Sequence, residues 1–318
     1  MSKVVLVTCA TGKQGSAVVN ALLNQGRNKF TILAVTRDVS SPAATRLAQK
    51  SSSIKLVQGN LNDVPALFQE AQRKVYPEPI WGVYSVQISV GKGVTLESEV
   101  RQGKALIDES IRAGVKHFVY SSVERGGDDA SWDNPTPIPH FQSKYHIERH
   151  LRDTTKPGKP GASMGWTILR PVAFMDNLSP GFPTKVFLAA LRNHLNPSSK
   201  PMQWVATSDI GAFAAKALAS PERWDRRAVG LAGDELSWTQ LDASFAKATG
   251  SPAPVAYWFF GSALTYAVAE VGTMIRWFAR EGYKADVRAR REEHPGMLTM
   301  EQWLVRESTF DTTRTRRS

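Results

Sequence analysis

A histidine and a lysine stand four residues apart in the stretch His140-Phe141-Gln142-Ser143-Lys144. On a helix this spacing puts both side chains on one face, and Glu148 continues that face by another turn. An imidazole with an ordinary pKa of about 6.5 can donate a proton near neutrality, while an ammonium group lowers the donor's pKa and orients a ribose. The pattern predicts acid–base chemistry at Lys144 and His140. The alternative is that His140, which follows Pro139, only begins the helix.

Two serines, Ser121 and Ser122, follow a short apolar run that is typical of a strand. Hydroxyl groups at the carboxyl end of such a strand would meet a substrate carbonyl, although serines are common at strand ends in general. His146 and His150 have the spacing of metal ligands on a helix, but the sequence offers no evident third ligand. We therefore expect no metal site.

The stretch Thr8-Cys9-Ala10-Thr11-Gly12-Lys13-Gln14-Gly15 lies between an apolar run and a helical pattern. Backbone N–H groups and the helix dipole converge on an anion at such a turn, which predicts pyrophosphate binding. A dinucleotide turn needs small residues at three positions, occupied here by Cys9, Gly12 and Gly15. The alternative is an ordinary strand-to-helix turn. The predicted nucleotide contacts are Thr11, Gly12, Lys13, Gln14 and Gly15.

Arg37 follows the second apolar run, where an NAD-specific site would place a ribose-binding carboxylate. A guanidinium pairs bidentately with a 2′-phosphate, whereas a carboxylate would repel it. NADP(H) is therefore favoured over NAD as the cofactor. Asp38, the next residue, is the competing carboxylate, and the alternative for Arg37 is a solvated charge.

Later positions complete the predicted cofactor site. The stretch 58–63 offers amides for adenine, while Asn62 or Asp63 could equally open the next helix. The loop 87–93 should face the nicotinamide, because its glycines permit close approach or movement, and residues 170–175 are expected opposite it. The contacts expected here are Asn60, Leu61, Gln87, Lys144 and Pro171.

Short apolar runs alternate with helical periodicity in the first half of the chain. This alternation predicts an α/β fold with a parallel sheet, whose strand ends share one edge where a ligand can sit. The expected strands are 4–8, 31–36, 54–58, 80–86, 117–121 and 166–169, and the expected helices are 16–25, 43–50, 64–75, 96–113 and 141–152.

A boundary near residue 155 is expected to separate a nucleotide-binding domain, 1–155, from a domain for substrate or partner contacts, 156–318. One strand and some helices of the second part should return to the sheet, and helices should dominate from Phe174 onward. The loop 124–139 is long enough to suggest a lid. The apolar stretch 255–271 is interrupted by polar residues and shorter than the roughly 20 residues of a membrane span, so we expect a buried helix.

The amino-acid composition and net charge restrict the classes of protein to which this chain can belong. The chain has 318 residues, 42% hydrophobic and 22% charged, which indicates one large or two fused globular domains and excludes disordered and collagen-like proteins. The net charge is +11, but the cations are scattered, which favours a solvated surface over nucleic-acid binding. The single cysteine and a first strand in place of a targeting segment favour the cytoplasm. Neither a nucleic-acid nor a membrane partner is expected.

Aromatic side chains are dense in the C-terminal half. Such residues are more often core than pocket, but their density suits a flat, apolar aromatic or polyketide-like ligand better than a sugar. They include Tyr257, Trp258, Phe259, Phe260, Tyr266, Trp277 and Phe278.

Taken together, these stretches resemble the NmrA-like family, atypical members of the short-chain dehydrogenase/reductase superfamily, nearly from end to end. The resemblance implies a Rossmann-type, doubly wound sheet with a smaller, mostly helical C-terminal domain. It also implies a nucleotide pocket built from Gly12, Gln14, Gly15, Arg37 and Lys144. The matching stretches are 10–15, 35–37, 58–60, 140–144, 169–177 and 298–304.

The resemblance leaves two functions open. Some members look like reductases of phenolic or polyketide compounds, and others look like redox sensors that bind NADP without turnover and contact a regulatory protein. In the similar isoflavone-reductase-like branch, a lysine at the Lys144 position is the principal catalytic residue. We therefore expect an NADPH-dependent oxidoreductase that reduces a carbonyl or conjugated double bond, with the sensor as the alternative. The sequence departs from the family pattern at Cys9 and Asn60.

Overall fold

The computed structural model describes residues 2–26, 29–88, 91, 93–195 and 200–312. Their contacts divide the chain into two compact units, each assembled from separate segments. The first comprises Met1–Val123, Gln142–Arg170 and Ile210–Val229; the second comprises Glu124–Phe141, Pro171–Asp209 and Gly230–Ser318. The chain thus passes repeatedly between the units, and the functional division at residue 155 stays a prediction.

One seven-stranded sheet has the order β3-β2-β1-β4-β5-β6-β9. Neighbouring strands from β3 to β6 pair in parallel, and the order reverses between β1 and β4. This is the predicted Rossmann-type, doubly wound sheet. Its strands are β1 (Lys3–Val7), β2 (Phe30–Thr36), β3 (Ile54–Gln58), β4 (Ile80–Ser85), β5 (His117–Ser121), β6 (Gly165–Pro171) and β9 (Arg227–Leu231).

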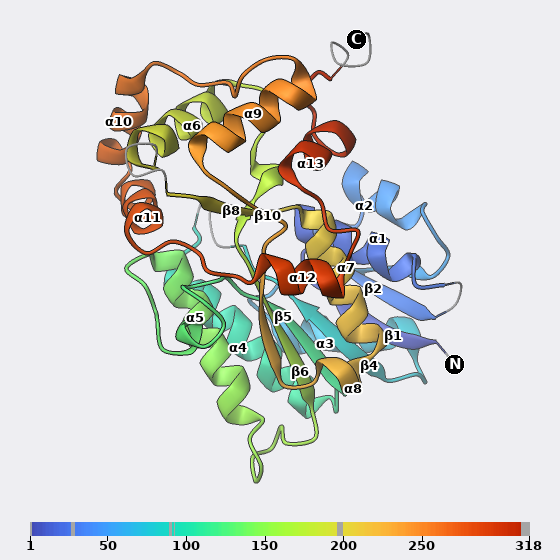
Figure 1. Ribbon diagram of the computed structural model, residues 1–318. Helices are drawn as coiled ribbons and strands as arrows, with labels where there is room; N and C mark the ends of the chain where they lie inside the picture. The colour runs from blue at the N-terminus through green and yellow to red at the C-terminus, as the bar shows by residue number, and fades with distance from the viewer. Residues whose placement is uncertain (1, 27–28, 89–90, 92, 196–199, 313–318) are drawn as a thin grey trace. The chain divides into compact units, whose positions relative to one another are not determined.

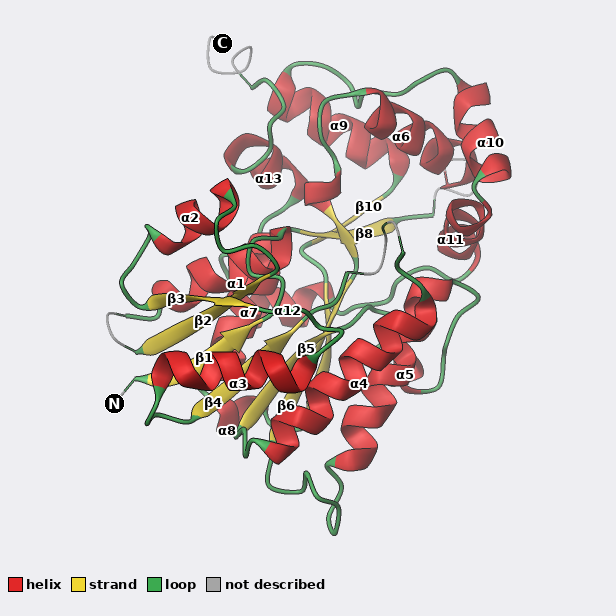
Figure 2. Cartoon of the chain, turned by 180° about the vertical axis from the view of Figure 1, so that it is seen from behind, coloured by secondary structure: helices red, strands yellow, loops and turns green. Residues whose placement is uncertain are grey.

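Helices flank this sheet on both faces. Figure 2 shows α3 and α4 crossing one face, and a Cβ at Gly103 of α4 would meet the Ile147 side chain of α5. On the other face, visible in Figure 1, Gly211 of α7 lies against the backbone of Ala17 in α1. The helices are α1 (Lys13–Leu23), α2 (Pro42–Ala48), α3 (Val64–Val75), α4 (Leu96–Arg112), α5 (Pro139–Thr154), α7 (Thr207–Ala219) and α8 (Pro221–Trp224).

Side-chain caps fix where several of these helices begin. Ser41, Asp63 and Thr95 each accept a hydrogen bond from a first-turn amide of α2, α3 and α4 respectively. Pro42 and Pro65 stand at first-turn positions where no N–H donor is needed. The predicted N-cap after the third strand is thus confirmed at Asp63. Apolar strand residues such as Val5, Leu6 and Ile32 are completely buried and form the core beneath the helices.

The second unit is mostly helical, but it contains strands that the sequence did not reveal. A three-stranded sheet has the order β10-β8-β7, with strands of two to four residues that are too short to show periodicity. The elements are η1 (Ala130–Trp132), β7 (Ala173–Phe174), η2 (Met175–Asn177), α6 (Phe182–Leu195), β8 (Met202–Val205), β10 (Asp234–Leu236), α9 (Trp238–Thr249), α10 (Trp258–Ala267), α11 (Ala269–Arg280), α12 (Val287–Glu293) and α13 (Met300–Arg306).

The expectation of one buried helix over residues 255–271 is wrong. The segment forms α10 and the start of α11, and α10 exposes much of its aromatic surface. Trp277 and Phe278 of α11 are buried, as expected of core aromatics. Among the residues described, no helix has the length and apolar character needed to cross a membrane.

The long loop after β5 is held by buried charged side chains. Arg125 is completely buried and donates to the carbonyls of Ser131 and Asn134 at 2.6 and 3.0 Å. Glu124 accepts from the amides of Gly127 and Lys284. These contacts, all within the second unit, make the segment an anchored loop, and the expected lid movement stays a prediction.

Candidate functional site

The turn between β1 and α1 has the shape that the small residues predicted. Cys9 has a φ of +48°, in the left-handed region that glycine adopts most readily. A Cβ at Gly15 would overlap the backbone carbonyl oxygen of Cys9, whereas one at Gly12 would lie 3.2 Å from the same oxygen. Only glycine therefore fits at position 15 without a shift of the turn.

The N-terminus of α1 has no side-chain cap, unlike those of α2, α3 and α4. Its N-cap residue is Gly12, and the first turn contains no acidic residue. N–H groups and the positive end of the helix dipole at this terminus can take an anion. The two flanking predicted contacts, Thr11 and Lys13, are half-buried and exposed respectively.

Gln14 contacts side chains of β4 and β5. Its Oε1 accepts hydrogen bonds from Ser121 Oγ at 2.6 Å and from the Tyr84 hydroxyl at 3.3 Å. Tyr84 is completely buried, and burial raises the pKa of its phenol. Gln14 and Ser121, predicted separately as a nucleotide contact and a catalytic hydroxyl, are thus hydrogen-bonded to each other.

Lys144 of α5 forms a buried ion pair. Its Nζ lies 2.5 Å from Glu99 Oε1 of α4, and the two side chains are 8% and 1% exposed. Ser143 Oγ donates to the other Glu99 oxygen at 2.7 Å. The ammonium group also lies 5.8 Å from the centroid of the Tyr120 ring at the end of β5. Lys144 is therefore positioned by Glu99 of α4 and the Tyr120 ring of β5, both in the first unit.

A second buried ion pair lies one turn further along α5. Arg170 of β6 donates from Nε and Nη2 to the two oxygens of Glu148, at 3.1 and 2.7 Å. Both side chains are almost completely buried. This bidentate contact ties the helix that carries Lys144 to the sheet.

Lys144 and Arg37 both act electrostatically on the turn. Burial raises the pKa of the Cys9 thiol, and the positive charges of Lys144 and Arg37 oppose that shift. Arg37 is exposed at the end of β2. The competing carboxylate, Asp38, accepts from the amide and hydroxyl of Ser40 at 2.8 and 2.6 Å, which lowers its pKa. Among the described residues Arg37 forms no ion pair, whereas the carboxylate of Asp38 is hydrogen-bonded to Ser40.

Gln87 follows β4 and carries an unsatisfied buried atom. Its Nε2 donates to Ser85 Oγ at 2.9 Å, while its Oε1 has no hydrogen-bond partner within the described parts of the chain. A buried carbonyl oxygen without a donor is costly, which fits a site completed by a ligand. Of the loop that follows, residues 89, 90 and 92 lie outside the described residues.

The remaining predicted site residues show fewer contacts with the glycine turn or with Lys144. Asn60 Oδ1 accepts from the Asn62 amide at 3.0 Å, and Leu61 is half-buried in the same turn. Ser122 is buried, and its amide donates to the Leu169 carbonyl at 2.7 Å. His140 and Pro171 belong to the second unit, where His140 Nδ1 lies 2.6 Å from Glu270 Oε1.

No metal cluster occurs among the described side chains. His150 Nε2 instead lies 2.7 Å from Asp108 Oδ1.

Sequence reasoning missed Glu99 and Tyr84. Glu99 shares a helical face with Gly103, Leu106 and Ile107, all buried. A charged residue on such an apolar face indicates that an oppositely charged side chain is buried beside it. The helical periodicity of this segment alone could have identified Glu99.

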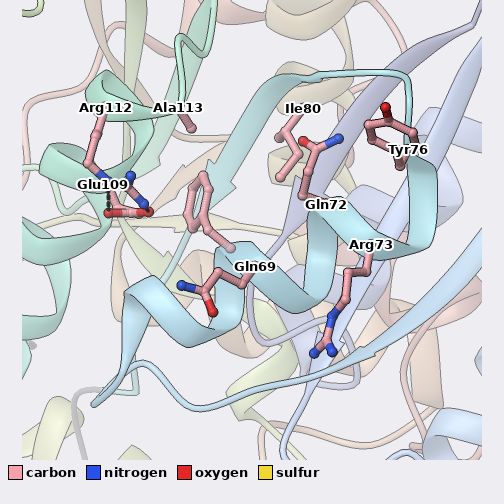
Figure 3. A pocket seen from close by; sticks show the side chains of 9 residues that line it. Gln69, Gln72, Arg73, Tyr76, Ile80, Glu109, Arg112 and Ala113 are labelled. Carbon is pink, nitrogen blue, oxygen red and sulfur yellow. Dashed lines mark hydrogen bonds and ion pairs between the residues drawn. The ribbon is translucent and has the colours of Figure 1, made fainter.

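A groove of about 600 Å³ lies elsewhere in the first unit, between α3 and α4 (Figure 3). Its charged side chains are paired within their own helices, Arg73 with Glu70 and Arg112 with Glu109. It contains none of the predicted site residues. The lining residues are Phe68, Gln69, Gln72, Arg73, Tyr76, Ile80, Glu109, Arg112 and Ala113.

Comparison with known proteins agrees with this architecture. The NmrA-like oxidoreductase lnaB of Aspergillus flavus is 27% identical over 262 residues, covering 79% of this chain and 74% of the relative. The structure of NmrA, a negative transcriptional regulator in complex with NADP, aligns with a TM-score of 0.64 at 17% identity over 96% of this chain and 95% of NmrA. Triphenylmethane reductase from Citrobacter sp., complexed with NADP(H), gives a TM-score of 0.69 at 17% identity, covering 96% and 99% of the two chains.

The structural likenesses establish the fold. The sequence profile of the NmrA-like family matches residues 1–304, which is nearly the whole chain. The chain therefore belongs to the NmrA-like family.

Proposed function

We propose that this protein is an NADPH-dependent oxidoreductase that reduces a carbonyl or conjugated double bond of an apolar aromatic or polyketide-like molecule. The observation that carries the proposal is the buried Lys144–Glu99 pair, in the same unit as the uncapped glycine turn. Lys144 acts electrostatically on Cys9 in that turn, so the cation is near the proposed nucleotide. The name of the Aspergillus relative, an oxidoreductase, supports this reading.

The first unit would hold NADPH along the carboxyl edge of its sheet. The amides at the start of α1, flanked by Thr11, would take the pyrophosphate, and Arg37 would pair with the 2′-phosphate. Asn60 and Leu61 would contact adenine. The unsatisfied Gln87 Oε1 would accept a hydrogen bond from the nicotinamide carboxamide.

Bound NADPH would supply the hydride. Lys144 would donate a hydrogen bond to the ribose and to the substrate oxygen, and its ammonium would provide the proton that completes the reduction. Glu99 holds this ammonium and compensates its charge in a buried setting. His140, Ser121 and Ser122 remain the other candidate proton donors, and Pro171 a candidate contact of the nicotinamide. We assign substrate contacts to residues 156–318 and place the protein in the cytoplasm.

The test is anaerobic oxidation of NADPH with quinones, phenolic ketones and enones. We expect turnover with at least one of these classes and a loss of roughly 10²- to 10⁴-fold in kcat for Lys144→Met. Lys116→Met is the control, because Lys116 is exposed and lies at the opposite end of β5 from Tyr120. Bound NADPH without turnover in any class would refute the enzyme proposal.

A second candidate is a non-catalytic NADP(H) sensor that regulates a protein partner. The observation that favours it is that the hydroxyl of Ser121, one of the candidate proton donors, already donates to Gln14. The similarly folded NmrA is a transcriptional regulator. A pull-down that recovers a partner only with NADP present, or only without it, would support the sensor. Identical recovery in both conditions would count against it.

A further inference from the structure

The helix α10 exposes aromatic side chains that would normally be buried. Tyr266, Tyr257 and Trp258 are 93%, 76% and 66% exposed. Large rings gathered on a protein surface mark a binding face. We call this set the aromatic patch: Phe182, Tyr257, Trp258, Phe259, Phe260 and Tyr266, all exposed and all within the second unit.

The aromatic patch is built into the fold. α10 packs against α6 and α11. The backbone just before α10 is fixed by the Ala256 amide, which donates to the Lys185 carbonyl at 3.0 Å, and Asn193 Nδ2 donates to the Trp258 carbonyl at 2.9 Å. The Phe182 ring of α6 meets the Phe260 ring edge-on at 5.3 Å. The rings are therefore presented by packed helices.

No charged residue occurs from Ser251 to Ala269, although much of this run is exposed. An exposed helix usually keeps a charged or polar face toward water. Trp and Tyr among apolar residues are instead typical of the boundary between lipid headgroups and acyl chains. The composition of α10 is thus that of a surface which enters this boundary.

Cations flank the uncharged helix. Lys185 lies one turn after Phe182 on α6, and Arg276 of α11 lies near the α10 carbonyl of Thr265, since a Cβ at Gly272 would meet both. These two and Arg280, the cationic rim, form no ion pairs among the described side chains. The nearby acid Glu270 is paired with His140. The two helices that pack against α10 carry a net positive charge, because Lys185, Arg192, Arg276 and Arg280 outnumber the single acid Glu270.

We propose that the aromatic patch docks onto the surface of an anionic phospholipid bilayer, with its rings at the headgroup level and the cationic rim against lipid phosphates. A second copy of this chain is the less suitable occupant, because a two-fold contact would bring the two cationic rims together. An anionic bilayer neutralises them. This docking differs from the absence of a membrane partner expected from sequence, which rested on the scatter of the cations along the chain and on the lack of a spanning segment.

Vesicle flotation tests the proposal with the full chain. Wild-type protein should float with vesicles of phosphatidylcholine and phosphatidylserine, less with phosphatidylcholine alone, and less again at high salt. The triple variant Tyr257→Ser, Trp258→Ser, Phe259→Ser should lose at least roughly tenfold in partitioning. Lys185→Gln with Arg276→Gln should lose roughly fivefold per cation, only on the anionic vesicles.

The matched control is Tyr76→Ser, which removes an 81% exposed ring from the first unit and should float like wild type. Circular dichroism verifies that the variants fold. The proposal is overturned if the wild-type protein does not float, or if both multiple variants float to the same extent as the wild type. Concentration-dependent dimerisation that the triple variant abolishes, without lipid binding, would assign the aromatic patch to a second copy instead.

Discussion

Lys144 Nζ lies 2.5 Å from Glu99 Oε1, with 8% and 1% of the two side chains exposed. This ion pair connects α5, on which the sequence placed candidate catalytic residues, to α4, on which it placed none. Buried charges are costly to place in a protein unless they are paired and hydrogen-bonded. Ser143 supplies the additional hydrogen bond to Glu99. The charge of the Lys144 ammonium group is thus compensated, and its position is fixed within the first unit.

Removing one partner of this pair should destabilise the fold. Lys144→Met leaves Glu99 buried without a counter-charge, and we expect a loss of about 3–5 kcal/mol in the free energy of unfolding. Adding Glu99→Gln should restore most of that loss. Denaturant unfolding of the two single variants and the double variant measures the coupling, with Lys116→Met as the exposed control. If the stability loss of the double variant equals the sum of the losses of the two single variants, the side chains do not interact, which would contradict the ion pair.

Arg37 should determine the choice between NADPH and NADH. Arg37→Ala removes the cation proposed to bind the 2′-phosphate, and we expect the Kd for NADPH to rise roughly 10- to 100-fold. The Kd for NADH should change little, because NADH lacks that phosphate. Arg46→Ala removes an exposed arginine of the following helix and is the control. An equal effect of Arg37→Ala on both nucleotides would assign Arg37 to the solvated surface.

Asp209 should make stability depend on pH. Burial raises the pKa of this carboxyl to about 7, aided by the negative charge of Glu307 and opposed by the Leu298 amide, which donates to it at 3.0 Å. The folded state thus favours the protonated form. Its stabilising contribution is complete below the ordinary pKa of 3.8 and is lost as the pH rises through about 7.

Replacing Asp209 by Asn should therefore flatten the decline in stability between about pH 4 and pH 7 by about 1–3 kcal/mol. Unfolding by denaturant at several pH values provides the measurement. Asp242→Asn is the control, since Asp242 also accepts a backbone amide, from Ala253, but is less buried. An unchanged slope for Asp209→Asn would show that this carboxyl does not contribute.

Gly15 should tolerate no side chain. Gly15→Ala places a Cβ against the Cys9 carbonyl oxygen, and relief requires a shift of the turn. We expect a loss of about 1–3 kcal/mol in stability, as in other overpacked sites. Gly12→Ala, whose Cβ would lie 3.2 Å from the same oxygen, should cost less. Thermal unfolding compares the two variants, and equal losses would contradict the steric argument.

The sequence predicted the sheet well because its strands are apolar and alternate with helices of clear periodicity. β5 was expected at the same residues that the structure gives it, and α3 likewise. The short strands β7, β8 and β10 escaped because two to four residues carry no period. Their positions depend on tertiary pairing.

The site was predicted less completely. Arg37, Gln87 and Lys144 were predicted from their positions after strands or on a helix, and their roles stay predictions, although Gln87 does carry an unsatisfied oxygen. The hydrogen bond between Gln14 and Ser121 joins residues 107 positions apart, and a local sequence pattern cannot predict a contact between residues so far apart in the chain. The exposure of α10 was missed because hydrophobic content alone indicates burial, while the exposed fraction depends on what packs against the helix.

Isothermal titration with NADPH tests the central claim most directly. The account predicts one binding site in the wild-type protein, weaker binding of NADH, and no measurable heat for a Gly15→Ala variant that circular dichroism shows to be folded. Absence of heat with both NADPH and NADH in the wild-type protein, or undiminished binding by Gly15→Ala, would contradict it.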